Sequence, residues 1–443
     1  MNSFIGVGTF ISPDAFFAFR RECMRKFVLL ILALMLHLHA WGVEADDSTS
    51  HLPDSVVIEV QNPEVPLRVV GDAISECDLP HYPFEIGGKT DEKQTLCFNP
   101  KVTTFVRDAE YFLPYTKGYS ALGFFLKPTF TYNHDERLSA SAGLHLLGIA
   151  GDHKKLREVS PIVRIEYKPT KSIRIVGGTL SDECIGHGLY QPMYDYDRLF
   201  YANKEDGLQV FAYTKHWYSE MWCNWEDFIV IDSPWQEKFT FGWVNSLKFV
   251  KPDRRFFIPI HLVMNHRGGQ IDAVQDTCIE TLANVAIGLE YLRQVNPDCS
   301  VGASLPVFGF SNRSNDQHIH THFKKGWGVY PQLIFRNYWV KNRYVAKKRC
   351  DHYVCAKVGY WYGDGFISGR GSYLFQSRSY FDDSFERRYR HMLTAEALYD
   401  LNNIMDFRFQ AYYDLDESSV DYAVTFALRF DRSFKLHSWA NKK

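Results

Sequence analysis

From about residue 97 onward, this chain repeats one pattern: long stretches in which apolar and mixed polar residues alternate, separated by turn-forming residues. Residues 420–430 show it clearly, because Val, Tyr, Val, Phe, Leu and Phe fill every second position. The same period runs through residues 239–249, 284–291 and 405–412. Successive side chains of a strand point to opposite faces, so each stretch has one apolar and one mixed polar face. The pattern predicts an all-β chain.

Three features favour a barrel in a membrane over a soluble sandwich or barrel. The stretches approach the roughly 9–11 residues of a tilted membrane strand, whereas ordinary strands average about 5–6. Aromatic residues, 16% of the chain, gather near the ends of the stretches, where their rings suit the headgroup level of a bilayer. The hairpins also continue too long for one soluble core. Because no apolar run after the N-terminal region could span a bilayer as a helix, we expect a closed antiparallel transmembrane β-barrel.

The connections between stretches predict the orientation and the number of strands. Short turns and long connections alternate along the chain, as in outer-membrane barrels with short periplasmic turns and longer external loops. The short turns are 133–137, 168–171, 251–255, 296–298 and 400–403, and the long connections are 181–206, 266–280, 309–325 and 364–388. Two connections at the long positions, 232–236 and 414–419, are nevertheless short. About fifteen strands follow Tyr119, and residues 97–112 add one more, which gives the even number 16.

The N-terminal region predicts export. Residues 1–45 form a leader, in which 24–45 resemble a secretory signal peptide: a basic start, an apolar run at 27–36 and small residues before Asp46. Residues 46–96 are expected to be a periplasmic or lumenal extension, 97–434 the barrel and 435–443 a C-terminal tail.

Charge, cysteines and motifs limit the chemistry. The net charge of −2 gives no field that attracts nucleic acid. After loss of the leader eight cysteines remain, and Cys350 and Cys355 are close enough in sequence for a local disulfide if a tight loop joins them. The motifs HExxH, GxSxG and GxxxxGK[ST] are all missing. The sequence therefore predicts neither an enzyme nor a cofactor.

Charged and polar residues on the mixed faces are candidates for the lining of the barrel lumen. They are Arg164, Glu166, Arg174, Glu290, Gln332, Arg336, Asp406, Arg408, Asp421 and Arg429. In a wide barrel they would line water and set ion preference. In a narrow or plugged barrel they would instead form a packed network of ion pairs. The sequence leaves both alternatives open, because the number of strands sets the width.

Histidines supply two weaker candidate sites. His318, His320 and His322 alternate, so on a strand they would share one face as a metal-ligand set, although a polar loop explains them as well. His187 lies between two glycines, which permit unusual backbone and close approach of a ligand, or simply form a turn. In the same connection, Asp195, Asp197 and Arg198 would line an entrance or fold into the lumen.

The signal peptide, the alternating strands and the terminal stretch 420–430 together resemble porin-like outer-membrane β-barrel proteins of an uncharacterised group. The resemblance implies a bacterial outer-membrane location in contact with lipid, and passage or uptake of small solutes as the function. Two alternatives stay open: a barrel whose surface loops bind glycan, capsule or a protein partner, and a barrel hydrolase with Ser/His or Asp/His pairs at the rim. The solute and the oligomeric state are not indicated.

Overall fold

The chain folds into one closed, all-antiparallel sheet, described by a computed structural model. The structure describes residues 93–439 apart from 171, 182–184, 215, 232, 252, 269–278, 297–298, 315–322, 340–351, 383 and 402–403. The predicted leader, most of the predicted extension and the last four residues of the tail lie outside this range. The sheet begins at Thr95 and ends at Ser438.

Most strands are longer than those of soluble proteins. The strands are β1 (Thr95–Glu110), β2 (Tyr119–Asn133), β3 (Leu138–Ile149), β4 (Glu158–Thr170), β5 (Ile173–Thr179), β6 (Asp206–Tyr213), β7 (Trp217–Asp227), β8 (Lys238–Lys251), β9 (Arg254–Arg267), β10 (Glu280–Asn296), β11 (Cys299–Ser314), β12 (Lys325–Val329), β13 (Gln332–Trp339), β14 (His352–Asp364), β15 (Tyr389–Leu401), β16 (Met405–Asp414), β17 (Ser419–Asp431) and β18 (Phe434–Ser438). The described residues also form three short helical turns: η2 (Ile185–Gly188), α2 (Arg198–Tyr201) and η3 (Tyr373–Phe375). Within the described residues, no helix has the length and apolarity needed to cross a bilayer.

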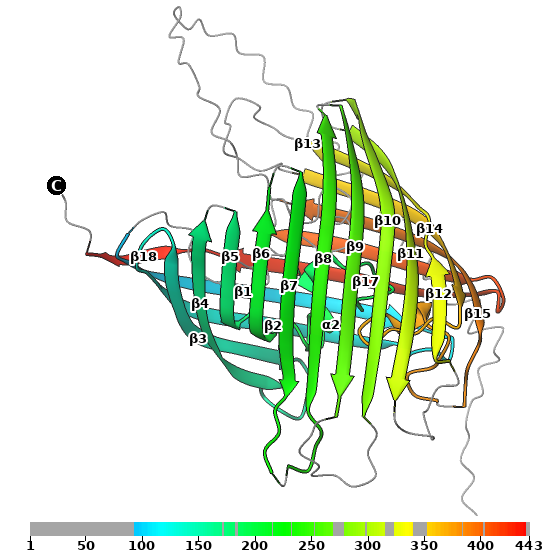
Figure 1. The fold of residues 1–443 in the computed structure, drawn as a ribbon, viewed down its shortest axis with the longest axis horizontal. Coiled ribbons are helices and arrows are strands. Elements are labelled where there is room, and N and C mark those ends of the chain that lie inside the picture. Colours follow the sequence, from blue (N-terminus) through cyan, green and yellow to red (C-terminus); the bar gives the residue numbers. More distant parts are fainter. Residues whose placement is uncertain are drawn as a thin grey trace, which may run out of the picture. The chain divides into compact units, whose positions relative to one another are not determined.

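These eighteen strands occupy sixteen positions around the ring (Figure 1). β12 and β13 are two parts of one position, because both pair with β11 and with β14. β17 and β18 likewise share one position, since both pair with β1. β1 also pairs with β2, which closes the ring. The predicted barrel of about 16 strands is therefore confirmed, including its first strand.

The two faces of the sheet differ as the alternation predicted. In β17, Asp421, Thr425 and Arg429 point inward and are buried, whereas Val420 and Leu428 point outward and are 46% and 44% exposed. Large exposed apolar side chains recur in this way on every long strand. An outer surface of this kind suits lipid and not water. The chain is a transmembrane β-barrel.

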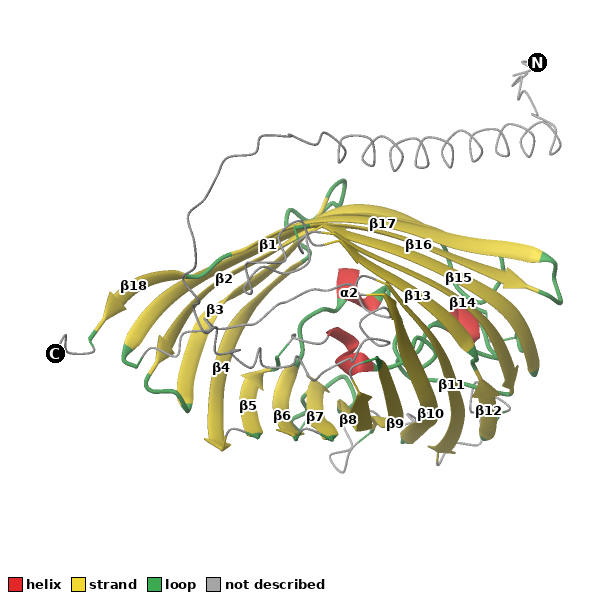
Figure 2. Ribbon diagram, turned by 90° about the horizontal axis from the view of Figure 1, so that it is seen from above, coloured by secondary structure: helices red, strands yellow, loops and turns green. Residues whose placement is uncertain are grey.

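Connections fall into two sets at the two ends of the barrel. The end that carries Thr95 and Ser438 also carries the short turns, and we call it the periplasmic end; the other is the external end. The connection 340–351 is an exception, because it is long but belongs to the short set. Two external connections fold back into the lumen: residues 180–205, here called the first insert, and residues 365–388, the second insert (Figure 2).

Candidate functional site

An apolar cluster fills the lumen across its width. Wall residues from β1 to β3, from β5 to β11 and from β14 to β17 contribute to it, so it reaches around almost the whole ring. The first insert adds Leu180, Leu189, Tyr190, Met193, Tyr194, Tyr196, Leu199 and Phe200, and the second adds Phe366, Ile367, Leu374 and Phe375. Packed aromatic and aliphatic side chains exclude water. At this level the barrel is plugged.

Arg370 of the second insert contacts both the first insert and the barrel wall. Its guanidinium pairs with Glu205 of the first insert and with Glu226 of β7, and its Nε donates to Thr240 Oγ1 on β8 at 2.8 Å. Its carbonyl oxygen accepts the Asp195 N–H at 2.6 Å. Arg370 is only 3% exposed. Charge-assisted hydrogen bonds in a low-dielectric interior are strong, so these contacts hold the plug in one position.

His187 of the first insert also links this insert to the barrel wall. Its Nδ1 lies 2.5 Å from Glu220 on β7, its Nε2 lies 2.8 Å from Glu205, and its ring stacks on Trp222 at 3.6 Å. Burial alone would lower the pKa of His187, but the charges of Glu220 and Glu205 raise it to about 9. At neutral pH the ring is therefore a cation whose two nitrogens are both engaged. This arrangement stabilises the plug and leaves no free nitrogen for base chemistry.

The charge on His187 predicts how the stability of the barrel depends on pH. The folded pKa of about 9 exceeds the unfolded value of about 6.5, so this contribution is complete below about pH 6.5 and is lost as pH rises through the folded pKa. We therefore expect the temperature at which the gel mobility shifts to that of the unfolded protein to fall between about pH 7 and pH 9 in the native protein. His187→Gln should flatten that fall. Asp195, whose pKa burial raises to about 7, titrates at the lower edge of this window. An unchanged pH profile in His187→Gln would contradict a stabilising role of the charged His187 ring.

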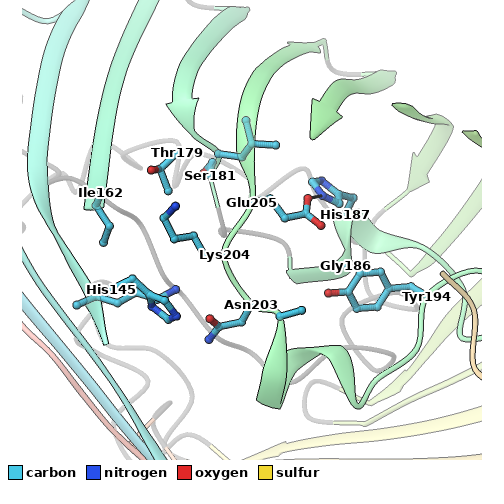
Figure 3. Close-up of a pocket in the computed structure, with 13 residues that line it drawn as sticks. His145, Ile162, Thr179, Ser181, Gly186, His187, Tyr194, Asn203, Lys204 and Glu205 are labelled. Atoms are coloured by element: carbon cyan, nitrogen blue, oxygen red, sulfur yellow. Dashed lines mark hydrogen bonds and ion pairs between the residues drawn. The ribbon is translucent and has the colours of Figure 1, made fainter. Parts of the chain in front are cut away.

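A small cavity lies between the first insert and the wall made by β2 to β5 (Figure 3). The space open to water centres measures ≈ 30 Å³, room for about two water molecules. Its lining residues are Lys127, His145, Ile162, Thr179, Leu180, Ser181, Gly186, His187, Tyr194, Ala202, Asn203, Lys204 and Glu205. The cavity thus combines polar and apolar side chains, and it borders both the plug and the barrel wall.

His145 on β3 is the chemically available side chain of this cavity. It is fully buried, and neither of its ring nitrogens has a hydrogen-bond partner among the described residues. In the β3–β4 register it lies directly opposite Ser160. Ser160 Oγ donates to Glu158 Oε1 at 2.8 Å, and Glu158 Oε2 lies 3.9 Å from His145 Nε2. A hydroxyl, an imidazole and a carboxylate thus gather on one inner face of two paired strands, the residue types that nucleophilic catalysis uses.

Sequence reasoning did not single out this group. Each residue type is common, and His145 and Ser160 become neighbours only through the register of β3 and β4. The available signal was a lone histidine at an inward position of an otherwise small and aliphatic strand. One chain without the register does not show which serine faces it.

The predicted lumen residues all lie on strands and face inward. Arg408 pairs with Glu396 at 3.2 Å, Arg429 pairs with Asp406, and Arg164 pairs with Glu166 at 2.8 Å. Three others contact uncharged groups: the Tyr190 hydroxyl donates to Glu290, the Phe112 N–H donates to Asp421, and the Arg174 guanidinium lies over the Phe211 ring. Arg336 and Gln332 are buried on β13. Most of these residues therefore belong to a packed network of ion pairs and hydrogen bonds. Their effect on passing ions stays a prediction.

The other candidates divide into described and undescribed residues. Asp195, Asp197 and Arg198 lie in the first insert, inside the lumen, where Asp197 pairs with Arg107 of β1 at 2.6 Å. His318, His320 and His322 lie outside the described residues, as does Cys350, while Cys355 is disulfide-bonded. The metal site and the Cys350–Cys355 pairing therefore stay predictions. Among the described residues, no group of three or more His, Cys, Asp or Glu could hold a metal ion.

Solved structures with a similar architecture are outer-membrane proteins. OprD of Pseudomonas aeruginosa is 8% identical, with a TM-score of 0.45 over 78% of this chain and 97% of its own. A loop-deletion mutant of OmpT of Vibrio cholerae is also 8% identical, with a TM-score of 0.44 over 76% of this chain and 100% of its own. OccAB4 of Acinetobacter baumannii is 9% identical, with a TM-score of 0.42 over 78% of this chain and 100% of its own. No curated protein matches the chain.

A family model matches nearly the whole described part of the chain, from residue 88 to residue 439. The match includes every strand, both inserts and the group around His145. Its description, Lipid A 3'-O-deacylase-type, denotes an enzyme, which the motifs of the sequence did not predict. The match covers well over half of the 443 residues, and the protein therefore belongs to the Lipid A 3'-O-deacylase-type family.

Proposed function

We propose that this protein is a hydrolase of the bacterial outer membrane that removes an ester-linked acyl chain from lipid A. The observation that carries the proposal is His145, a buried imidazole that lines the cavity, has no hydrogen-bond partner among the described residues and lies directly opposite Ser160. The name of the family supplies the substrate class, an acyl chain on the 3'-O position of lipid A.

The chemistry follows from the three groups in the lumen. His145 takes the proton of the Ser160 hydroxyl, and the serine oxygen attacks the carbonyl carbon of the ester. The sugar oxygen leaves with the proton that His145 returns. Water then enters, gives one proton to His145 and attacks the acyl-serine, which releases the fatty acid and restores the hydroxyl. Glu158, within 3.9 Å of the imidazole, stabilises its cationic form.

The hydrogen bonds of this group are suited to a resting state. Ser160 donates to Glu158 and not to His145. Catalytic hydrogen bonds in substrate-free enzymes are often long or misaligned and tighten when substrate binds. A rotation of the Ser160 hydroxyl toward the opposite strand would bring it to His145, because directly opposite residues have Cβ atoms about 4.5–5.5 Å apart.

Passage of small solutes is the second candidate function. The observation in its favour is the polar inner face of the barrel, which includes all ten predicted lumen residues. The observation against an open pore is the apolar cluster that joins both inserts to the wall. A channel would therefore require displacement of an insert. Binding of a glycan or protein by the external loops stays a prediction.

A mass spectrum of the product tests the proposal. We expect purified, folded protein in detergent to convert lipid A into a species that lacks one ester-linked acyl chain, with release of the free fatty acid. Heat-denatured protein provides the blank, and a phosphatidylethanolamine of similar chain length tests the need for the glycolipid. Unaltered lipid A after prolonged incubation with folded protein would overturn the proposal.

A further inference from the structure

The barrel wall is low at β5 and β6. β5 has 7 residues and β6 has 8, whereas their neighbours β4 and β7 have 13 and 11. The difference lies at the external end. β4 pairs with β5 only from Arg164 to Thr170, so among the described residues no strand pairs with residues 158–163 on that side. Figure 1 shows β5 and β6 ending before their neighbours.

The low wall reaches into membrane depth. An 8-residue strand is about 27 Å long, and a tilt of about 40° reduces its height to about 20 Å. The apolar band of an outer-membrane barrel is about 25 Å tall. β5 is shorter still. The wall therefore ends below the external edge of the bilayer, and we call this place the lateral notch: its floor is the Thr179–Asp206 pair, and its sides are residues 158–163 of β4 and residues 225–227 of β7.

The edge of β4 that faces the notch has few backbone N–H groups without a partner among the described residues. The Val163 N–H, which points toward β5, is satisfied by the Thr179 hydroxyl at 3.3 Å. Backbone groups alternate in direction along a strand, so the next residue that points the same way is Pro161, which has no N–H. Proline is well suited to the edge of a sheet for this reason. An edge with few unpaired donors can face lipid at a low cost.

The notch connects lipid to the cavity. On its outer side, Val159 and Val163 are each 59% exposed, and Leu208 is 54% exposed. Directly behind it lie Ile162 and Thr179, which line the cavity, and Ser160, which faces His145. Apolar contacts on the outside and ester-cleaving groups on the inside match a lipid that is apolar along its chain and polar at its ester.

We infer that the lateral notch admits an acyl chain of an outer-leaflet lipid from the membrane into the lumen beside His145. The inference rests on the proposed function for the identity of the lipid as an ester substrate. The access route itself can be measured without turnover. It also explains how a barrel whose lumen is plugged reaches a lipid substrate, because the substrate does not have to pass the inserts.

Quenching by a nitroxide on a lipid acyl chain tests the route. Single cysteines at Ser160 and Ile162, with the native cysteines that follow the leader replaced by serine, would carry a small fluorophore such as bimane in vesicles that contain doxyl-labelled phospholipid. Val159→Cys, which faces lipid, sets the upper limit. Asn312→Cys sets the lower limit, since Asn312 is an inward position near the external end of β11, where it pairs with Leu282 of β10 on one side and its N–H donates to the Lys324 carbonyl on the other at 2.9 Å.

We expect quenching at Ser160→Cys or Ile162→Cys to approach that at Val159→Cys and to exceed clearly that at Asn312→Cys. Two inner positions are used so that failure of one variant to fold does not end the test. Quenching of both at the level of Asn312→Cys would overturn the notch as a route. Strong quenching together with unaltered lipid A in the hydrolysis assay would keep the route and remove the proposed function, so the two failures are distinguishable.

Discussion

His145→Gln is expected to lower the rate of acyl release from lipid A by about 10²–10⁴-fold, the range that a positioned acid–base group contributes. Glutamine keeps much of the volume of the ring but cannot accept and return a proton. Ser160→Ala should lower the rate by a similar amount, because residues that act as one unit lose most of their effect together. The measurement is the initial rate of fatty-acid release by protein of verified gel mobility.

The matched control is His261→Gln. His261 on β9 is also an inward, buried histidine, 4% exposed, and it contacts Tyr190 instead of the cavity. We expect its replacement to leave the rate within a few-fold of the native value. Equal losses in His145→Gln and His261→Gln would point to packing, and full activity in His145→Gln would remove His145 from the mechanism.

Arg370→Met should lower the free energy of unfolding by about 3–5 kcal/mol, the cost of removing one partner from a buried ion pair. The carboxylates of Glu205 and Glu226 would lose their shared cation, although His187 still holds Glu205. The second insert would also lose its attachment to β7 and β8. We therefore expect brief openings in a planar bilayer, whereas the native protein stays closed. Urea unfolding and single-channel recording measure the two effects.

Arg388→Met is the control for Arg370. Arg388 also pairs with a carboxylate, that of Asp364, at 2.7 Å, but its side chain is 62% exposed. Exposed ion pairs contribute little to stability, so this variant should unfold and conduct as the native protein does. A native protein that conducts steadily at rest would contradict the plug and return the channel to first place among the proposed functions.

The architecture was predictable from the sequence because each strand carries its own signal. The alternation in residues 420–430 marks the two faces of β17, and the parity of the connections gave the sixteen positions that the pairings confirm. The plug was harder to predict from the sequence. Residues 181–206 and 364–388 were recognised as long connections, but the direction in which a connection folds depends on packing partners distant in sequence. One signal was present: Trp222 and Trp361 occupy inward positions, where a water-filled lumen would favour polar side chains.

The site was hidden for a related reason. His145 and Ser160 are ordinary residues until the β3–β4 register makes them face each other, and register follows from the whole sheet. The lateral notch depends on the lengths of β5 and β6, and strand ends are set by where the chain turns inward. Pro161 marks the free edge of β4, but other strands of this barrel also contain proline, for example Pro100 and Pro128. The residue type alone therefore does not identify the edge.

Arg107 has a consequence for assembly of the barrel. It belongs to the first strand, pairs with Asp197 of the first insert, and donates to Gln410 of β16 and to Thr425 of β17 at 3.1 and 2.9 Å. One guanidinium thus spans the seam where the two ends of the sheet meet and the segment that lies inside it. If the first insert is absent when the seam closes, this cation is enclosed without its carboxylate, which is strongly unfavourable. Pairing of the last strand with the first is therefore more favourable when the first insert already lies inside the barrel. We expect the insert to enter the lumen before β17 pairs with β1.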